Sequence, residues 1–486
     1  MKRVKQKYLV MAYLSRFMMI IGLILFIPLL VLPFYPQEVI YCKDFIIPAL
    51  IAILLGGGLT KVLPFERSQR LSVGDDAVIV VGAWILAIIF SAMPFVFSHQ
   101  LNVTQAIFES VSGWTTTGLS VVNTEQTAHI FLIHRSVTQF FGGVGIVLVL
   151  LSALSSTFGL QLYQSEGHND YLLPNLIKSS RLILGIYFGY IIIGVLLYTL
   201  FGMPLFDAIN HSIDALSTGG FSVKTLSIEA YDSVAIEVIT IVLMLLGTTN
   251  FAAHLLLLRG RLKSFFKLGE IKFMALLIGI GVALLTVSLA GTVLGSLGDS
   301  FRVAIFQVIS ALSTTGYATT SYTTFTSSAL FIMIVLMIIG GGAGSTSGGI
   351  KLYRFLLLVK QSIWNVYLQF KPEHFIKEPF VLKPEGKVYL TNDDFKEASN
   401  YAFIYMVLLG IGTFIFLVMG YPLQVSLFEF ASSLGTVGLS IGITAPDLHP
   451  LLLWTEIVGM LFGRLEIWVI FISLIKICTR RKRGRN

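Results

Sequence analysis

Four short runs of Ser, Thr and Gly lie between apolar segments of this chain, and they hold its best candidates for binding a cation. The runs read GWTTTGLSV, ALSTGGFSV, ALSTTGYAT and SLGTVGLSI. Each has a threonine two residues before an aligned glycine: Thr116 and Gly118, Thr218 and Gly220, Thr314 and Gly316, Thr436 and Gly438. Glycine takes backbone angles that other residues avoid, so successive carbonyl oxygens can turn to one side. Four such segments around one axis would form rings of oxygen that replace the water around an ion.

The predicted ion-binding segment is the T-x-G part of each run. It comprises Thr116, Thr117, Gly118, Thr218, Gly219, Gly220, Thr314, Thr315, Gly316, Thr436, Val437 and Gly438. Filters built on TVGYG work in this way, although here Ser120, Ser222, Ala318 and Ser440 stand at the second glycine. The middle residue also varies, so we expect a filter without strict four-fold symmetry. One such run is typical of an ordinary loop, whereas four in register indicate a pore.

The elements around these runs repeat as well. A short apolar element precedes each run and ends near Phe108, Asn210, Phe306 or Phe428. A glycine follows each run within the next apolar segment: Gly142, Gly247, Gly340 and Gly463. The short element is too short to cross a bilayer and predicts a re-entrant pore helix. Because the unit of span, pore helix, T-x-G turn and span crosses twice, all four copies face the same way.

Composition indicates a polytopic membrane protein. The chain has 486 residues, of which 55% are hydrophobic and 12% charged, against roughly 25% charged in soluble domains. Ten transmembrane helices are expected near 8–32, 45–63, 77–97, 135–158, 181–202, 234–258, 272–297, 328–358, 399–420 and 452–478. The predicted fold is therefore all-α, with ten transmembrane helices plus four re-entrant pore helices in four parallel repeats around a pseudo-four-fold axis. Lys and Arg clusters place both termini in the cytoplasm.

The same pattern predicts the division of the chain. A two-helix extension occupies 1–70, and pore repeats occupy 71–170, 171–265, 266–360 and 399–486, with a cytoplasmic loop at 361–398. The net charge of +8 is explained by basic residues at segment ends, so a nucleic-acid partner is not expected. Cys42 and Cys478 form no metal or redox motif, and no catalytic cluster is visible. We therefore do not expect an enzyme.

A glycine-rich run interrupts the predicted span 328–358 and is a candidate gate. It comprises Gly340, Gly341, Gly342, Gly344, Ser345, Thr346, Ser347, Gly348 and Gly349, with Ala343 between them. Each glycine costs a helix about 1 kcal/mol relative to alanine, so the span should break here. A phosphate-binding P-loop is excluded because Ile350 follows Gly349 where that motif requires lysine. The alternative is a run of small residues that allows close helix packing.

Charged residues near the predicted membrane interior prompt two further expectations. Arg464 lies in the last span, where a charge needs a partner, and we expect it to bind carbonyls of the glycine-rich run. The alternative is that it extends to the membrane interface. Glu109 and Glu429 share one position near the ends of the short helices, with Asp214 nearby. They are expected either to make the outer mouth negative or to be solvated loop carboxylates.

The T-x-G loops, the segment GGGAGSTSGGIKLYRFLLLVKQ and the segment MLFGRLEIW resemble the Trk/Ktr/HKT superfamily of potassium transporters, and two extra N-terminal spans point to its bacterial Trk branch. The resemblance implies a multi-pass protein of the bacterial cytoplasmic (inner) membrane that takes up K⁺. It matches the filter glycines to the four aligned glycines, the gate loop to Gly340–Gly349 and the gate arginine to Arg464.

The resemblance also implies partners. These are a second copy in a homodimer, the lipid bilayer, and a cytoplasmic TrkA-type regulatory subunit, through which a nucleotide (ATP/ADP or NAD(H)) acts. No organic cofactor is expected in the chain itself. In sodium-favouring relatives the first filter glycine is serine, whereas all four are glycine here. A less selective K⁺/Na⁺ or Na⁺-coupled transporter is the alternative within the superfamily. A membrane-embedded transferase or a structural subunit fits the residues less well.

Overall fold

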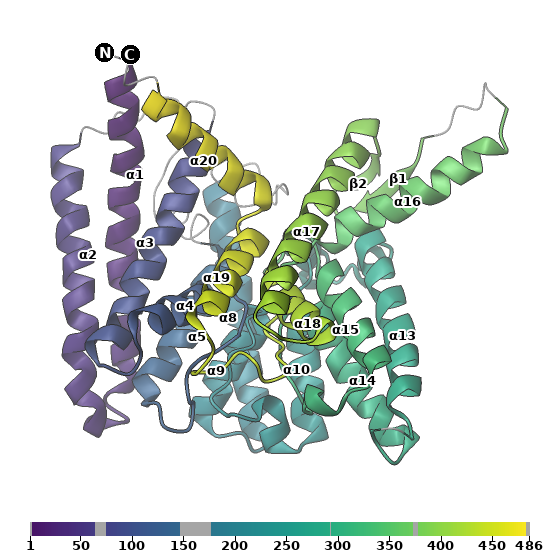
Figure 1. Cartoon of the computed structure of the whole chain (residues 1–486), viewed down its shortest axis with the longest axis horizontal. Coiled ribbons are helices and arrows are strands. Elements are labelled where there is room, and N and C mark those ends of the chain that lie inside the picture. Colours follow the sequence, from purple (N-terminus) through teal and green to yellow (C-terminus); the bar gives the residue numbers. More distant parts are fainter. Residues whose placement is uncertain (1, 64–73, 146–175, 292, 373–377, 483–486) are drawn as a thin grey trace.

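The computed structural model describes residues 2–63, 74–145, 176–291, 293–372 and 378–482. Helices make up nearly all of its regular structure, as the composition predicts. The N-terminal extension is a pair of helices, α1 (Lys2–Ile24) and α2 (Cys42–Val62), joined by the short turns η1 (Ile27–Val31) and η2 (Pro36–Tyr41). The pair packs beside the rest of the bundle, and α1 begins at the same end of the molecule where the chain finishes (Figure 1).

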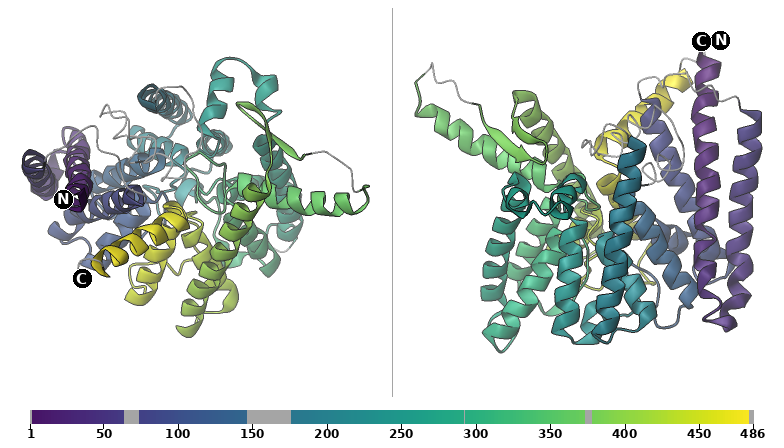
Figure 2. Two further views of the ribbon diagram at one scale, coloured as in Figure 1. Left: turned by 90° about the horizontal axis from the view of Figure 1, so that it is seen from above. Right: turned by 180° about the vertical axis from the view of Figure 1, so that it is seen from behind.

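The remaining chain repeats one order of elements four times. The first helices of the units are α3 (Asp75–Phe97), α8 (Leu176–Leu200), α13 (Gly269–Leu289) and α17 (Asn392–Val418). The pore helices are α4 (Val103–Trp114), α9 (Leu205–Leu216), α14 (Leu297–Leu312) and α18 (Leu423–Leu434). The second helices are α5 (His129–Val144), α10 (Val234–Gly247), α15 (Ser327–Ile339) and α19 (Pro450–Arg464). Seen from above, the units follow one another around the centre in sequence order, which confirms the predicted parallel repeats (Figure 2).

Local sequence explains where the pore helices begin. Asn102 caps α4: its side chain accepts from the Gln105 amide, and the Gln105 side chain accepts from the Asn102 amide. This reciprocal capping satisfies donors that a helix start leaves free. Pro204 and Pro422 stand immediately before α9 and α18. Their extended backbone, with ψ of 143° and 149°, marks the boundary before each helix, and proline has no amide hydrogen with which to continue a preceding helix.

Most second helices are shorter than the spans predicted for them. Within the part of the chain that the structure describes, six helical segments are long and apolar enough to cross a membrane alone: Tyr8–Val31, Pro36–Val62, Asp75–Phe97, Ser180–Leu200, Gly269–Leu289 and Asn392–Val418. The pair α10 and α11 (Phe251–Leu258) reaches that length together but bends by 115°, and the pair α19 and α20 (Ile467–Lys482) bends by 104°. The span expected at 135–158 is helical to Val144 and then continues outside the described residues.

The predicted cytoplasmic loop 361–398 is largely ordered structure. The helix α16 (Leu352–Gln369) runs into it, and α17 begins within it. Between them lies an antiparallel hairpin of β1 (Phe380–Lys383) and β2 (Gly386–Tyr389), a departure from the all-helical prediction. Val381 of β1 is buried and packs in one cluster with Leu356 and Phe395. This contact holds the hairpin against the bundle, while α16 extends outward (Figure 1).

Candidate functional site: a four-fold ring and the loop beneath it

The four T-x-G segments adopt one backbone conformation. Their threonines have φ of 53°, 51°, 57° and 49° in order of the repeats, and their glycines 91°, 72°, 86° and 89°. A positive φ is uncommon for a β-branched residue, so four in register mark a conformation that the surroundings impose. The amide of each middle residue donates to the pore helix five residues earlier: Thr117 to Ser112, Gly219 to Asp214, Thr315 to Ser310 and Val437 to Ser432. These bonds occupy the amides of the middle residues and tie each segment to the end of its own pore helix.

The glycines close the segments into a ring. A Cβ placed on any one of them would overlap a carbonyl oxygen of the next repeat: Gly118 on Gly219, Gly220 on Thr315, Gly316 on Val437, and Gly438 on Thr117. The order runs from the first repeat to the fourth and back to the first. Because each contact needs a residue without a side chain and with a positive φ, glycine is required at all four positions.

The threonine hydroxyls at the inner end of the ring fall into two pairs. Thr218 Oγ1 bonds Thr346 Oγ1 at 2.9 Å, and Thr314 Oγ1 accepts from the Gly348 amide at 2.9 Å. Thr116 Oγ1 and Thr436 Oγ1 are buried and have no hydrogen-bond partner. The glycine-rich run therefore hydrogen-bonds two of the four threonines, and its Gly348 also packs directly against the Thr436 side chain.

The glycine-rich run is held in the bend between α10 and α11. The Gly342 amide donates to the Thr248 carbonyl at 3.1 Å, and Asn250 Nδ2 donates to the Ala343 carbonyl at 2.7 Å. Positive φ values at Gly340, Gly344 and Gly349, of 71°, 65° and 79°, fold it into a compact loop. The span thus breaks where glycine content predicts, and its polar groups are satisfied by neighbouring backbone.

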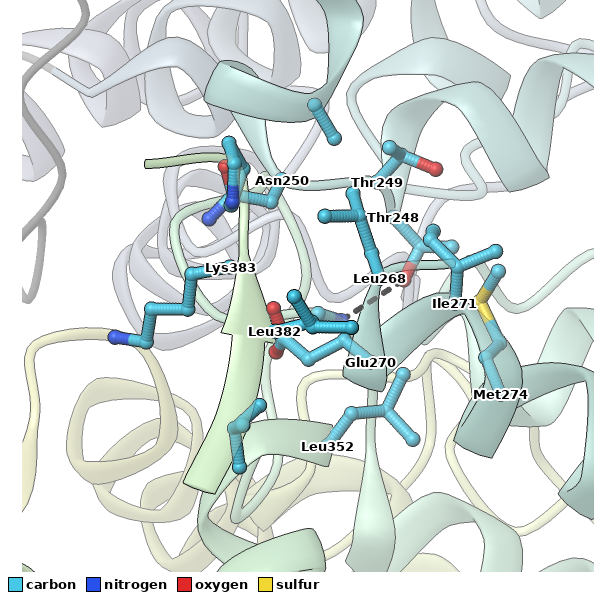
Figure 3. A pocket seen from close by; sticks show the side chains of 14 residues that line it. Thr248, Thr249, Asn250, Leu268, Glu270, Ile271, Met274, Leu352, Leu382 and Lys383 are labelled. Carbon is cyan, nitrogen blue, oxygen red and sulfur yellow. Dashed lines mark hydrogen bonds between the residues drawn. The ribbon is translucent and has the colours of Figure 1, made fainter. Parts of the chain in front are cut away.

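A cleft reaches the loop from the side that carries the hairpin. It is small, with a volume of about 20 Å³, and is lined by Thr248 at the end of α10 and by residues of α11, α13 and β1 that include Lys383; Glu270 lies at its centre (Figure 3). Glu270 Oε1 accepts from the Ala343 amide at 3.1 Å. The hairpin, α13 and the loop therefore meet at one place.

Arg464 joins the loop to the first repeat. It donates to the Thr346 carbonyl at 2.9 Å and to the carbonyls of Gly142 and Gly143 at 2.5 and 2.8 Å. The predicted contact with the glycine-rich run is present, and the guanidinium points to backbone oxygens rather than to the membrane interface. Hydrogen bonds from a charged donor are stronger than neutral ones, so Arg464 holds the loop firmly to the first repeat.

A buried ion cluster beside the loop was not predicted. Glu466, 6% exposed, pairs with Lys351 at 3.2 Å and with Arg354 at 2.8 Å. It connects the start of α16 to the bend between α19 and α20.

Comparison with known proteins agrees with this geometry. The cation transport protein family TrkH matches residues 43–482, nearly the whole chain. The chain belongs to the TrkH family. It is 30% identical to the Trk system potassium uptake protein TrkG of Escherichia coli over 462 residues, which cover 92% of this chain and 93% of that protein. An uncharacterized cation transporter of Methanocaldococcus jannaschii is 29% identical over 464 residues, 94% of this chain and 92% of that protein.

A solved structure extends the comparison to the fold. The crystal structure of the potassium transporter TrkH from Vibrio parahaemolyticus superposes with a TM-score of 0.84 at 26% identity. The match covers 96% of this chain and 98% of that one, so the whole architecture is shared.

In this TrkH-family chain, Glu109 and Glu429 are not at an open mouth, and both expectations for them were wrong. They are 1% and 0% exposed and lie behind the filter. Glu109 accepts from Ser120 Oγ at 2.9 Å and from the Val121 amide at 3.0 Å. Glu429 accepts from Ser440 Oγ at 2.8 Å and from the Ile441 amide at 2.7 Å. The serine that replaces the second filter glycine is thus a tether for the chain leaving the filter.

The other two repeats use the same position with different chemistry. His211 Nε2 lies 3.1 Å from Ser222 Oγ, and Gln307 Nε2 donates to Thr319 Oγ1 at 3.2 Å. Arg135 adds a bond between repeats, because it pairs with Glu109 at 2.7 Å and donates to the Ser222 carbonyl at 3.1 Å. Asp214 is also buried and accepts from Ser136 Oγ at 2.7 Å. These buried groups fix the filter's outer side, and nothing in the repeat alignment had assigned them that role.

The aligned glycines of the second helices also have a structural reason. A Cβ on Gly142, Gly247 or Gly463 would overlap the carbonyl of the last pore-helix residue of its own repeat. Those carbonyls belong to Trp114, Leu216 and Leu434. At Gly340 the obstructing carbonyl is instead that of Gly348. In the third repeat the loop therefore takes the place of this contact. Within the described residues no group of His, Cys, Asp and Glu is arranged to hold a metal ion.

Proposed function

We propose that this chain takes up K⁺ across the cytoplasmic membrane through a pore on the axis of its four repeats, with the twelve T-x-G residues as the selectivity filter. The observation that carries the proposal is the closed ring in which each glycine packs on a carbonyl of the next repeat. Rings of backbone carbonyls are the usual means of replacing the water of a K⁺ ion. Relatives named as Trk potassium uptake proteins support K⁺ as the ion.

The loop Gly340–Gly349 is the proposed gate. It lies under the ring, it bonds two of the four threonine hydroxyls, and all but one of its residues are buried. In this position it blocks the route from the filter to the side that carries the hairpin. Arg464 fastens the closed loop, and its positive charge adds a barrier to cations.

The pore is proposed to act without enzymatic chemistry and with two kinds of protein partner. One is a second copy of the chain, and the other is a cytoplasmic TrkA-type regulatory subunit that binds ATP/ADP or NAD(H). Because the hairpin, Glu270 and the loop meet at this cleft, a subunit that binds the hairpin could shift the loop through Glu270. Basic clusters favour a bacterial inner-membrane orientation with both termini cytoplasmic. The proposed repeat boundaries remain 71–170, 171–265, 266–360 and 399–486.

Isotope uptake into liposomes tests the proposal. Purified protein is reconstituted with internal K⁺, and uptake of external Rb⁺ is followed with K⁺ or Na⁺ as competitor. We expect K⁺ to compete and Na⁺ to compete much less. Equal competition by both ions would favour the alternative of a less selective K⁺/Na⁺ pathway, and absence of flux from a loop-shortened variant would overturn the pore itself.

A further inference from the structure

Gln139 of the first repeat reaches into the filter of the second. It lies on α5 and is fully buried. Its Nε2 donates to the Gly219 carbonyl at 2.7 Å, and its Oε1 accepts from the Phe221 amide at 3.3 Å. The two partners fix the orientation of the amide, because the flipped group would face oxygen with oxygen and N–H with N–H.

The filter residue that Gln139 contacts differs from its three counterparts. Gly219 is the middle residue of its T-x-G segment, where the other repeats have Thr117, Thr315 and Val437. A Cβ on Gly219 would overlap the Gln139 amide. The missing side chain and the glutamine are therefore one complementary pair.

The position of Gln139 is equally exceptional. It stands three residues before the aligned Gly142, and the same register in the other repeats holds Met244, Met337 and Met460. By sequence register, the other three repeats thus have an apolar methionine where the first has Gln139, and a middle filter residue with a side chain where the second has Gly219. The interface between the first and second repeats combines an amide with glycine.

We propose that Gln139 is a positioning residue that sets ion specificity, by holding the Gly219 carbonyl of the ring through a hydrogen bond from behind. The inference rests on the proposed filter. A carbonyl oxygen has two lone pairs, so one can bind the amide while the other faces the ion. The bond limits movement of this oxygen toward a smaller ion, and the donor also weakens its negative potential. Both effects disfavour Na⁺ relative to K⁺, since a smaller ion needs oxygens that are closer and of higher field strength.

The test measures ion preference in three variants of the full chain. Gln139→Met introduces the residue of the other repeats, and Gln139→Glu keeps the shape but replaces the donor with an acceptor. We expect both to lower the K⁺ over Na⁺ preference by about fivefold, the factor that corresponds to one neutral hydrogen bond. Met460→Leu, in the same register of the fourth repeat, should leave the preference unchanged. Preference is read from competition in liposomes and, without flux, from the K⁺ and Na⁺ concentrations that stabilise the purified protein against heat.

A companion pair of variants tests the complementarity. Gly219→Thr should prevent folding while Gln139 is present, and Gly219→Thr with Gln139→Met should restore a folded protein whose preference matches that of Gln139→Met. The inference is overturned if Gln139→Met and Gln139→Glu keep the wild-type ratio, or if Gly219→Thr alone folds with wild-type preference. Failure of the proposed function would look different, because the wild-type protein itself would then show no preference between K⁺ and Na⁺ in either measurement.

Discussion

The inner threonines of the filter share one backbone but not one environment. Thr218 and Thr314 bond the glycine-rich loop, whereas the hydroxyls of Thr116 and Thr436 have no partner. The backbone repeats because each pore helix ends in the same way. The side-chain environment does not repeat, because only the third repeat supplies the loop. The comparison teaches that four segments with one backbone can differ in side-chain bonding, because the loop hydrogen-bonds only two of the four threonines.

Gly316→Ser should have the largest effect, because it breaks the backbone that all four segments share. The added side chain overlaps the Val437 carbonyl and sits at a positive φ. Overpacking costs about 1–3 kcal/mol, and a loss of that size corresponds to a roughly fivefold to hundredfold lower K⁺ over Na⁺ preference in liposome competition. Gly279→Ala is the control, because a Cβ there meets nothing within 4 Å. An unchanged preference in Gly316→Ser would refute the filter assignment.

Arg464→Ala should have the second-largest effect, because it releases the loop from the first repeat while the two threonine bonds remain. Three hydrogen bonds from a charged donor are lost. Loss of even one such bond, worth about 1.5–3 kcal/mol, corresponds to at least roughly tenfold more open pore. Rb⁺ uptake without any partner subunit should rise accordingly. Equal or lower uptake by a well-folded variant would contradict the gate.

Comparing Thr314→Val with Thr116→Val tests whether the threonines that bond the loop differ in role from those that do not. Both changes keep the β-branched shape and remove only the hydroxyl. In Thr314→Val the loop loses one neutral hydrogen bond, so basal uptake should rise by about fivefold. In Thr116→Val no loop contact is lost, and the change should appear as weaker K⁺ competition at unaltered basal uptake. The comparison fails if the two variants raise basal uptake equally.

Thr218→Ser should have the smallest effect. The hydroxyl that bonds Thr346 is kept, and only a methyl group is removed. We expect basal uptake close to that of the wild type, and a loss of stability of about 1 kcal/mol because the removed methyl group is buried. A rise as large as that of Thr314→Val would show that the methyl group, rather than the hydroxyl, holds the loop.

Much of the fold follows from the sequence because the repeat is strong. Four glycines in register, each after a short apolar element, predict the pore helices and their order. The bends of 115° and 104° could not be predicted, because they depend on the loop that Thr248 and Arg464 bind. The hairpin was missed because its strands have only four residues each and bury little beyond Val381.

The candidate site was less predictable than the fold. The filter and loop residues stand out by composition, and the four segments do meet in a ring. Glu109 and Glu429 were misassigned because a carboxylate near a loop is usually solvated, and their partners lie beyond the turn. Gln139 carried one signal, an amide at a register where the other repeats have methionine, but its partner lies in the next repeat. A single sequence does not reveal such contacts between repeats.

The contacts that close the ring join the two ends of the sequence, so the ring can be completed only after most of the chain has been synthesised. Gln105 Nε2 donates to the Pro446 carbonyl across 341 residues of sequence, and Arg464 donates to Gly142 across 322. The Thr117 carbonyl meets its neighbouring glycine only when Gly438 arrives. A chain that is still being synthesised therefore holds three quarters of the ring. In the proposed pore, the segment that completes the ring also brings Arg464 to the proposed gate, so the ring is not complete before the residue that holds the loop is present.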